Sequence, residues 1–584
     1  MIKVRDLSYS YPQKDLYKNV SFTIEDEVHC ALIGTNGTGK STLLDLLMHR
    51  DEYLYDGKIE IDNTDKIGYV SQFSQLDPKE DVTVFQYISE EFVKHERKII
   101  DFCRAMETAE ELETIFLDYQ RELDEWNAID GDFYESNIKK QLKLAGLQKL
   151  EEQKINSLSG GEFKLIQAIK EMMLSPRFLI MDEPDVFLDF QHLNSLRNLI
   201  NAHKGTLLII THNRYLLNHC FNKILHMENM DVQEFDGTYT EYNFELLSTK
   251  IALEEAAAAD QAEIERQSNI LAKSRARASE FDNASLGRAV HARQTLVDRL
   301  KERKTKAPFV DIKQPEIHFE TDGEITDEYI LELTDYSVSF DEQLLEHVDF
   351  QMRPGEHVAI VGGNGTGKTT LLREIFENRK ESVRISEAAE TAMFSQVTGA
   401  GYDDSKTLLE IMAEKGFEAP KDAWEYLKKF GFEGDTLHQK VSGLSGGEKD
   451  LFQLAVLSLG KANLLLMDEP TGHLDIYAQI ALEQAVTEYK GAVLMVSHDY
   501  YTVANCMDYV LLVENNTLRR MSSRRFRQMV YANYFDKDYL LLEQKKKELE
   551  TRIQQMLRAN EFEKAKDLME PLEECIKKMK PLMA

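Results

Sequence analysis

The sequence predicts an α/β protein with two copies of one domain, joined by an α-helical hairpin and followed by a short helical extension. Three observations support this fold class. Four motifs recur in the same order in both halves of the 584-residue chain. Short apolar runs, typical of buried parallel strands, precede these motifs in each half. A helix-favouring segment that contains none of the motifs separates the halves.

The spacing of the motifs defines the repeat. The recurring stretches are Gly34–Ser41 and Gly362–Thr369, Leu158–Glu162 and Leu444–Glu448, Met181–Pro184 and Met467–Pro470, and Thr211–His212 and Ser497–His498. The last three pairs share an offset of 286 residues, so this part of the domain has no net insertion in either copy. Gln72 and Gln396 are 324 residues apart, which places 38 extra residues in the first copy between Gln72 and Ser159.

Each copy contains a glycine-rich loop directly after an apolar run, at 30–33 and at 358–361. Both loops fit the phosphate-binding pattern G-x-x-x-x-G-K-[ST]. Its glycines let backbone N–H groups turn toward phosphates, and the next helix adds its positive end. We expect Lys40 and Lys368 to reach the β- and γ-phosphates of ATP, and Ser41 and Thr369 to ligate Mg²⁺. The predicted nucleotide-binding residues of the two loops are Gly34, Asn36, Gly37, Gly39, Lys40, Ser41, Thr42, Gly362, Asn364, Gly365, Gly367, Lys368, Thr369 and Thr370.

A second apolar run in each copy, at 178–182 and at 464–468, ends in an aspartate that a glutamate follows directly. Asp182 and Asp468 are suited to hold Mg²⁺ through its water shell. The adjacent Glu183 and Glu469 can polarise a water molecule toward the γ-phosphate. A single acidic residue would more often be a solvated loop residue. The same D-E-P triplet follows an apolar strand twice, which favours catalysis.

Two histidines and two glutamines complete the predicted sites. His212 and His498 each lie 29 residues after the glutamate of the same copy. A lone histidine is more often structural, but the equal spacing favours a role as γ-phosphate sensor. Gln72 and Gln396 close short apolar-Ser-Gln stretches and fit a loop that senses the metal and the attacking water, although this pattern is less specific.

The stretch Leu-Ser-Gly-Gly-Glu is absent from ordinary phosphate-loop ATPases, and with it the chain resembles the ATP-binding cassette superfamily. In that family two cassettes close head to tail around two ATP molecules, and the signature Ser and Gly contact the γ-phosphate held by the opposite cassette. The resemblance implies one site with Lys40, Asp182, Glu183 and His212 facing Ser445, Gly446 and Gly447, and one with Lys368, Asp468, Glu469 and His498 facing Ser159, Gly160 and Gly161. It maps the family's A-loop aromatics onto Tyr11 and Phe340, for which core packing is the alternative, and its D-loops onto Leu188-Asp189 and Leu474-Asp475.

The segment between the cassettes has an unusual charge. Two helix-favouring stretches, 251–273 and 288–306, flank a polar break, which predicts an antiparallel hairpin. Residues 266–306 contain eleven basic and four acidic side chains, a charge of +7, whereas the chain as a whole carries -32. The other 543 residues therefore carry -39. A solvated helix face usually mixes signs evenly, so this excess favours a surface that binds phosphates.

Composition excludes several other classes of protein. A net charge of -32 argues against a general nucleic-acid binder. Five scattered cysteines without a C-x-x-C pair predict neither a disulfide framework nor a metal cluster. No apolar run is long enough to span a bilayer, and the first residues lack the apolar core of a signal peptide. We therefore expect a cytoplasmic protein without membrane insertion.

Tandem cassettes, a basic hairpin and no membrane domain together resemble the ABC-F family of translation factors, over residues 1 to about 525. The resemblance implies an ATPase that binds the ribosomal E site in its ATP-closed state, contacts rRNA and the P-site tRNA through the hairpin, and leaves on hydrolysis. It also implies a monomer whose cassettes pair within one chain. The role is a housekeeping translation factor or an antibiotic-resistance protection factor, and the irregular motifs lean slightly toward resistance.

The expected domains are 1–242 with a helical arm-like insertion at about 90–130, 243–325 for the basic hairpin, 326–525 for the second cassette, and 526–584 for a helical extension with a break at Asn560. The insertion is either the arm of an ABC-F protein or a longer helical subdomain.

The first cassette departs from the family pattern D-E-P-T-N-H-L-D at Asp185, Val186 and Phe187. Both glutamates remain, so we expect both sites to bind ATP, and the motifs leave open whether the two sites hydrolyse it equally. The alternatives are the ATPase subunit of a transporter with a separate permease, against which the basic hairpin counts, and a DNA-repair cassette ATPase, for which 38 inserted residues are too few.

Overall fold

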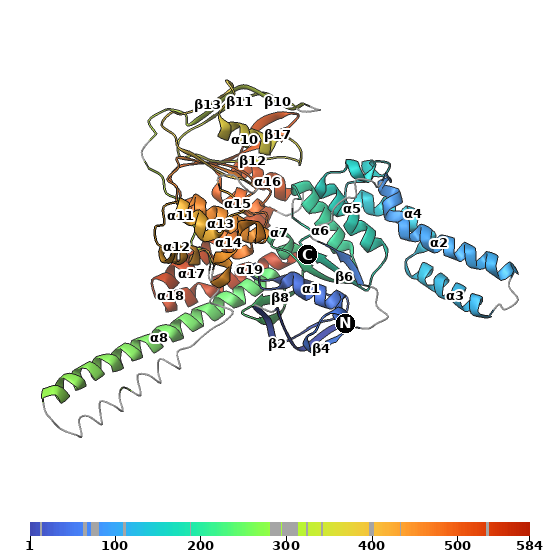
Figure 1. The fold of residues 1–584 in the computed structure, drawn as a ribbon, viewed down its shortest axis with the longest axis horizontal. Coiled ribbons are helices and arrows are strands. Elements are labelled where there is room, and N and C mark those ends of the chain that lie inside the picture. The colour runs from blue at the N-terminus through green and yellow to red at the C-terminus, as the bar shows by residue number, and fades with distance from the viewer. Residues whose placement is uncertain are drawn as a thin grey trace. The chain divides into compact units, whose positions relative to one another are not determined.

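The computed structural model describes residues 1–583 apart from 12–13, 62–66, 72–80, 109–112, 187, 281–293, 295–313, 323–324, 340–342, 396–401, 433 and 533–536. The chain forms two compact units. The first combines Met1–Asp236 with Lys313–Met529, and the second combines Gly237–Ile312 with Val530–Ala584. Within the first unit we call residues 1–236 the first cassette and residues 313–529 the second cassette (Figure 1).

The first cassette is built on a six-stranded sheet with the order β5-β6-β7-β3-β8-β9. Its strands are β3 (His29–Ile33), β5 (Ile67–Val70), β6 (Phe178–Asp182), β7 (Thr206–Ile210), β8 (Lys223–Glu228) and β9 (Asp231–Asp236). All neighbours are parallel except β8 and β9. Every residue of β6 and β7 is buried, as expected for the central strands of a parallel sheet. The carboxyl ends of β3, β6 and β7 therefore lie together at one edge of the sheet.

A second, antiparallel sheet of order β2-β1-β4 and, within the described residues, seven α-helices complete the first cassette. The strands are β1 (Ile2–Tyr11), β2 (Lys14–Ile24) and β4 (Asp56–Glu60). The helices are α1 (Lys40–Met48), α2 (Val84–Thr108), α3 (Glu113–Ala128), α4 (Tyr134–Leu144), α5 (Gly160–Met173), α6 (Phe190–Ala202) and α7 (Arg214–Cys220). Helices α2 and α3 pack side by side (Figure 1). Aromatic rings join α2 and α3 to α4. Phe92 of α2 stacks on Tyr134 of α4 with ring centroids 5.1 Å apart and contacts Trp126 of α3 edge to face.

The second cassette repeats this plan, with sheet orders β14-β15-β16-β12-β17-β18 and β11-β10-β13. Its strands are β10 (Leu331–Ser339), β11 (Gln343–Met352), β12 (His357–Val361), β13 (Val383–Ile385), β14 (Thr391–Phe394), β15 (Leu464–Asp468), β16 (Ala492–Val496), β17 (Tyr509–Glu514) and β18 (Thr517–Ser522). Its helices are α10 (Lys368–Glu377), α11 (Leu408–Glu414), α12 (Pro420–Lys428), α13 (Gly446–Leu457), α14 (Ile476–Glu488), α15 (Tyr500–Cys506) and α16 (Ser523–Ala532). Short 3-10 turns lie at Arg50–Glu52, Gly131–Phe133, Gln148–Leu150 and Ile155–Ser157 in the first cassette. In the second cassette they lie at Gly434–His438 and Val441–Gly443. The prediction of two α/β copies is confirmed.

Each cassette buries its own core between its two sheets. In the first, Leu32 of β3 and Leu43 of α1 pack with Phe22 of β2. In the second, Ile360 of β12 and Leu371 of α10 occupy the corresponding places. Helices α1 and α10 are thereby fixed against the strands that precede them, and this packing positions the glycine-rich loops between strand and helix.

The second unit consists of helices from two distant parts of the chain. Helix α8 (Tyr239–Glu280) is 42 residues long, and α17 (Lys537–Arg558), α18 (Phe562–Asp567) and α19 (Met569–Met583) form the C-terminal extension. Ile251 of α8 packs into a core with Leu549, Ile553 and Leu572. Asn560 has a left-handed φ of 57° between α17 and α18, so the predicted break and the helical extension are confirmed. The predicted tip and second arm of the hairpin, residues 281–313 apart from 294, lie outside the described residues.

Candidate functional site

Both glycine-rich loops run from a central strand into a helix whose first residue is the motif lysine. The N-cap residues Gly39 and Gly367 have φ values of 99° and 90°, a left-handed conformation that glycine adopts without strain. A Cβ at Gly39 would also lie 2.9 Å from the Tyr17 hydroxyl. Both lysines are buried at the start of their helices. Lys40 Nζ donates to the Gly34 and Thr35 carbonyls at 2.9 Å each, which holds the ammonium group in the loop.

The second loop has the same arrangement. Lys368 Nζ donates to the carbonyl oxygens of Gly362 and Gly363 at 3.0 and 2.6 Å. The hydroxyl of Thr369 donates to Asp468 Oδ1 at 3.2 Å, which joins two predicted magnesium ligands. Burial is the main influence on both loop lysines, and it lowers the pKa of Lys40 and Lys368.

The predicted magnesium aspartates lie at the ends of β6 and β15, next to these loops. Asp182 is 4% exposed and Asp468 is 0% exposed. Asp182 Oδ1 and Asp468 Oδ2 have no hydrogen-bond partner in the structure. Burial raises the pKa of Asp182, and it raises that of Asp468 to about 6. A buried carboxylate oxygen without a donor is costly alone, so this geometry fits a divalent cation with oxygen ligands.

The predicted catalytic glutamates share an unusual backbone conformation. Glu183 and Glu469 have φ values of 47° and 49° although neither is glycine. Their N–H groups donate to the last carbonyls of the neighbouring strands, Ile210 at 3.0 Å and Val496 at 2.9 Å. Left-handed conformations in non-glycine residues cost free energy and gather at functional sites. The same strain at both positions favours a functional constraint on the direction of each carboxylate.

Each glutamate lies close to the predicted histidine of its own cassette. His212 Nε2 is 4.0 Å from Glu183 Oε1, and His498 Nε2 is 3.3 Å from Glu469 Oε1. The backbone N–H of His498 also donates to Glu469 Oε2 at 3.0 Å. Burial raises the pKa of Glu469 to about 7, lowers that of His498 to about 3 and lowers that of His212. Both imidazoles are therefore neutral at neutral pH.

Each signature stretch forms the start of a helix. Ser159 and Ser445 are the N-caps of α5 and α13, and each forms a capping box with the glutamate three residues later. This cap places the glycines Gly160, Gly161, Gly446 and Gly447 in the first helical turn. Free backbone N–H groups in a first turn, together with the helix dipole, attract anions. The geometry can therefore contact a phosphate.

The cassettes meet head to tail within the first unit. The Asn36 backbone N–H donates to Asp475 Oδ2 at 3.0 Å, and its amide nitrogen donates to the His473 carbonyl at 2.9 Å. A Cβ at Gly447 would lie 2.0 Å from that amide nitrogen and 2.6 Å from the backbone oxygen of His473, so only glycine fits there without a backbone shift. The first glycine-rich loop thus contacts the D-loop and the signature glycine of the second cassette.

The reciprocal contact joins the other loop to the first cassette, where the Asn364 N–H donates to Asp189 Oδ2 at 3.3 Å. A cavity of about 500 Å³ adjoins this second glycine-rich loop. Among its lining residues are Lys368, Thr369, Thr370, Glu469 and His498 of the second cassette and Glu183, Asp185 and His212 of the first. Residues of both cassettes therefore surround one space of a size that suits a nucleotide.

The remaining predicted residues are less closely tied to the sites. Tyr11 is 47% exposed, and its ring meets Tyr9 edge to face at 5.4 Å. Tyr17, which the sequence did not single out, lies closer to the phosphate loop, because its hydroxyl donates to the Gly39 carbonyl at 2.5 Å. Gln72, Phe187, Phe340 and Gln396 lie outside the described residues.

Two further site residues were not predicted. Lys164 on α5 donates from Nζ to the Glu183 carbonyl at 3.0 Å and thereby supports the strained glutamate. Asp450, its equivalent at the offset of 286 residues, lines the cavity beside the second loop. Burial lowers the pKa of Lys164 and raises that of Asp450 to about 7. The opposite charges of Lys164 and Asp450 could have drawn attention to this position, because the signature stretch before it is identical in both copies.

Comparison with known proteins agrees with this architecture. The family model described as ABC transporter matches residues 17–186 and 345–472, and the chain belongs to this family. Its two cassettes make it an ATPase. Among the described residues, none of the helices combines the length and apolar character needed to cross a membrane.

Several relatives are similar to this chain over most of their length. The uncharacterized ABC transporter ATP-binding protein YfmM of Bacillus subtilis is 29% identical over 86% of this chain and 96% of its own. The ABC transporter F family member 2 of Arabidopsis thaliana is 28% identical over 96% and 81%. The energy-dependent translational throttle protein EttA of Escherichia coli K12 is 28% identical over 86% and 89%. Relatives of this protein thus include ABC-F members.

Solved structures support the fold alone. The crystal structure of an archaeal ribosome recycling factor, aABCE1, in complex with the stalk protein aP1 is 17% identical with a TM-score of 0.53. The match covers 90% of this chain and 92% of the archaeal chain.

Proposed function

We propose that this protein is a cytoplasmic ABC-F ATPase that binds the ribosome when ATP holds its cassettes closed and leaves after hydrolysis. The basic hairpin enters the ribosomal E site and contacts rRNA and the P-site tRNA. The protein acts as a monomer, either as a translation factor or as an antibiotic-resistance protection factor. The names of its relatives support this proposal, since they include an F family member and a translational throttle protein.

One observation carries the proposal, namely the charge gradient along helix α8. Residues 239–265 contain seven acidic residues and one basic residue, whereas residues 266–280 contain four basic residues and one acidic residue. The helix is continuous over its 42 residues, about 60 Å at 1.5 Å per residue. The basic end is therefore separated from the acidic start of the helix. A phosphate-rich partner is attracted to the end that precedes the predicted hairpin tip and repelled from the other end.

The C-terminal helices hold the acidic end of α8 in place. Lys566 Nζ lies 2.7 Å from Glu255 Oε2, and Lys580 Nζ lies 2.6 Å from Glu241 Oε1. These ion pairs are largely exposed and contribute little free energy alone. The apolar core around Ile251 and Ile553 beneath them supplies most of the anchoring. A helix fixed at one end can present its other end to a large partner in a defined direction.

We assign each group of site residues a role in this proposal. Lys40 and Lys368, with the N–H groups of their loops, bind the phosphates of the substrate ATP. Mg²⁺, when bound, neutralises phosphate charge, and Ser41 with Asp182 and Thr369 with Asp468 would hold it. Glu183 and Glu469 orient and polarise the attacking water, while the neutral His212 and His498 contact the γ-phosphate. Ser159 and Ser445, with the glycines that follow them, close each site from the opposite cassette.

Cosedimentation with ribosomes tests the proposal most directly. The double variant Glu183→Gln, Glu469→Gln keeps the shape of both sites but removes the carboxylate charge, so it should bind ATP without hydrolysing it. We expect this variant to sediment with ribosomes in ATP and to stay in the supernatant in ADP. If the variant stays in the supernatant in ATP at low salt, the proposed ribosomal function is refuted.

A charge-reversal experiment tests whether the hairpin, rather than another basic surface, binds the ribosome. In the double Gln background, Arg288→Glu, Arg293→Glu and Arg299→Glu together should weaken ribosome binding and reduce its salt dependence without changing ATP binding. The matched control reverses three exposed cations of the second cassette, Arg379, Lys421 and Arg525, and should retain more binding. Equal losses in both variants would show that only total charge matters. Susceptibility of expressing cells to ribosome-targeting antibiotics then distinguishes the two proposed roles.

A further inference from the structure

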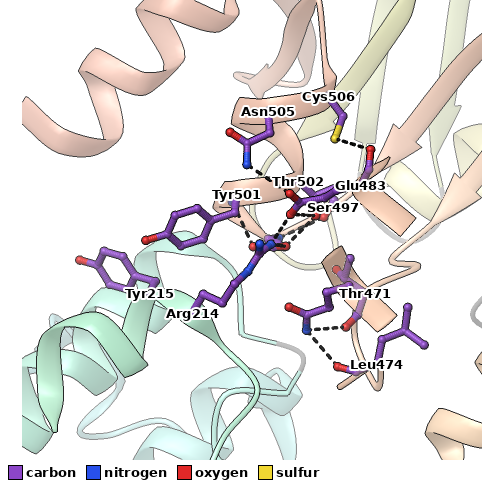
Figure 2. A network of polar contacts seen from close by, with 12 residues as sticks. Arg214, Tyr215, Thr471, Leu474, Glu483, Ser497, Tyr501, Thr502, Asn505 and Cys506 are labelled. Carbon is purple, nitrogen blue, oxygen red and sulfur yellow. Dashed lines mark hydrogen bonds and ion pairs between the residues drawn. The ribbon is translucent and has the colours of Figure 1, made fainter. Parts of the chain in front are cut away.

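One buried arginine crosses the interface between the cassettes. Arg214, two residues after His212, begins helix α7 of the first cassette. Figure 2 shows its side chain extending to Glu483 and the start of helix α15 in the second cassette. Its Nη2 donates to the Glu483 carboxylate and lies 2.9 Å from Asp499 Oδ2, while its guanidinium carbon lies 4.7 Å from the centre of the Tyr501 ring. The arginine is only 11% exposed, so water screens these contacts weakly.

The two carboxylates that receive this arginine are held by their own cassette. Thr502 Oγ1 donates to Asp499 Oδ2 at 2.7 Å and lies 3.2 Å from Glu483 Oε1, and Asn505 Nδ2 donates to Glu483 Oε2 at 3.2 Å (Figure 2). Burial alone would lower the pKa of Arg214, but the two carboxylates raise it above its ordinary value. Without the arginine, two partly buried negative charges would face each other at a shared hydroxyl, which is unfavourable.

The contact leads directly to the catalytic pair of the second cassette. Asp499 follows His498 in the chain and caps helix α15, where its Oδ1 accepts from the Tyr501 N–H at 3.0 Å. The N–H of His498 in turn donates to Glu469 Oε2 at 3.0 Å. Arg214 therefore holds the residue adjacent to the one that orients the catalytic glutamate. The backbone between Asp499 and His498 leaves little freedom between the two contacts.

The internal repeat shows that the other site lacks this contact. At the offset of 286 residues, Arg214 corresponds to Tyr500, and Glu483 and Asp499 correspond to Arg197 and Asn213. The cation is replaced by a phenol, one acid by a cation and the other acid by a neutral amide. The equivalent residues thus carry no acid that an arginine could bind. Asn213 still caps helix α7, so only the charged part of the arrangement is specific to one side.

We propose that Arg214 is a positioning residue that acts across the cassette interface on the second ATP site alone. When the cassettes close, its guanidinium enters between Glu483 and Asp499 and fixes the loop that holds His498 against Glu469. The first cassette thereby controls hydrolysis at Lys368 and Glu469, while hydrolysis at Lys40 and Glu183 has no such dependence. This proposal rests on the proposed catalytic role of the two glutamates but not on any ribosomal partner.

Single-site ATPase measurements test the proposal. Glu183→Gln leaves only the second site active, and Glu469→Gln leaves only the first. We expect Arg214→Gln to lower kcat roughly 10- to 100-fold in the Glu183→Gln background, the size of effect that small displacements of catalytic groups produce. In the Glu469→Gln background the change should stay below about 2-fold. KM for ATP at the second site should be unchanged, because Arg214 is not among the residues that line the cavity beside the second glycine-rich loop.

Two further variants guard against loss of folding. Arg214→Lys keeps the charge but loses the planar guanidinium whose Nη2 contacts both carboxylates, so it should restore part of kcat in the Glu183→Gln background. Arg177→Gln removes a half-exposed arginine that pairs with Asp26 within the first cassette, and it should leave both backgrounds unchanged. Equal losses from Arg214→Gln in both backgrounds, or no loss in the Glu183→Gln background, would overturn the proposal. Residual hydrolysis in the double Gln variant would instead refute the role of the glutamates.

Discussion

The two cassettes share their chemistry but differ in what surrounds it. Both place a buried lysine, a buried aspartate and a left-handed glutamate at the same edge of a sheet of the same strand order. The first carries the α2–α3 pair and Asp185 in its D-E-P segment, whereas the second carries Glu483 and Asp499, which bind an arginine from the first. The proposed catalytic groups are thus alike in both cassettes, while the residues around them differ.

The largest expected difference between the cassettes lies in their glutamates. Glu183→Gln and Glu469→Gln should each lower hydrolysis at their own site by about 10²- to 10⁴-fold, the usual contribution of a general base. Steady-state ATPase rates of the two single variants then compare the sites directly. We expect the Glu183→Gln protein, in which the second site with its arginine contact still works, to keep the higher rate. Equal residual rates would mean that the asymmetric surroundings do not reach the chemistry.

A core substitution at equivalent positions should show no difference between cassettes. Leu208 and Leu494 lie on β7 and β16 at the repeat offset, and each is 1% exposed. Replacing either with alanine should lower the free energy of unfolding by about 2–5 kcal/mol, because it removes buried methyl groups and leaves a cavity. Denaturant unfolding of the two variants measures both costs. A cost below about 1 kcal/mol in one cassette would show that its core collapses around the gap.

The smallest expected effect concerns the signature serines. Ser159→Ala and Ser445→Ala each remove one half of a capping box and should cost about 1 kcal/mol of stability. They should also reduce ATP turnover, since both serines face a proposed nucleotide site. Thr407, which caps α11 with Glu410 outside both sites, provides the control. Thr407→Ala should lose similar stability with unchanged turnover, and a matching loss of turnover would argue that capping alone explains the serine variants.

Much of the fold could be predicted because the repeat reinforces weak local signals. The apolar runs before Gly34 and Gly362 became strands β3 and β12, and the predicted helical extension with a break at Asn560 became α17, α18 and α19. The D-E-P triplets were found for the same reason. Their left-handed glutamates were not, because φ at a non-glycine residue depends on the strand that its N–H meets, and Ile210 lies 27 residues away in sequence.

The sequence also did not predict which residues contact each other between the two cassettes. The sequence shows Arg214 beside His212, but Glu483 lies 269 residues further along the chain. Only the closed pairing of the cassettes brings them together, and no local pattern encodes that distance. Tyr17 was missed because its hydroxyl donates to a backbone carbonyl, which every residue possesses. The opposite charges of Lys164 and Asp450 mark their position in the sequence, but they do not reveal that Lys164 donates to the Glu183 carbonyl.

The core that anchors helix α8 has a consequence for how the chain folds as it is made. Ile251 packs against Leu549, 298 residues later. At about 5–20 residues per second, roughly 15–60 s pass between the synthesis of these two residues. The first cassette can fold in that interval, but the acidic base of α8 has its apolar face uncovered until the last helices emerge. The basic end of the helix therefore gains its fixed support only when the whole chain, with both ATP sites, has been completed.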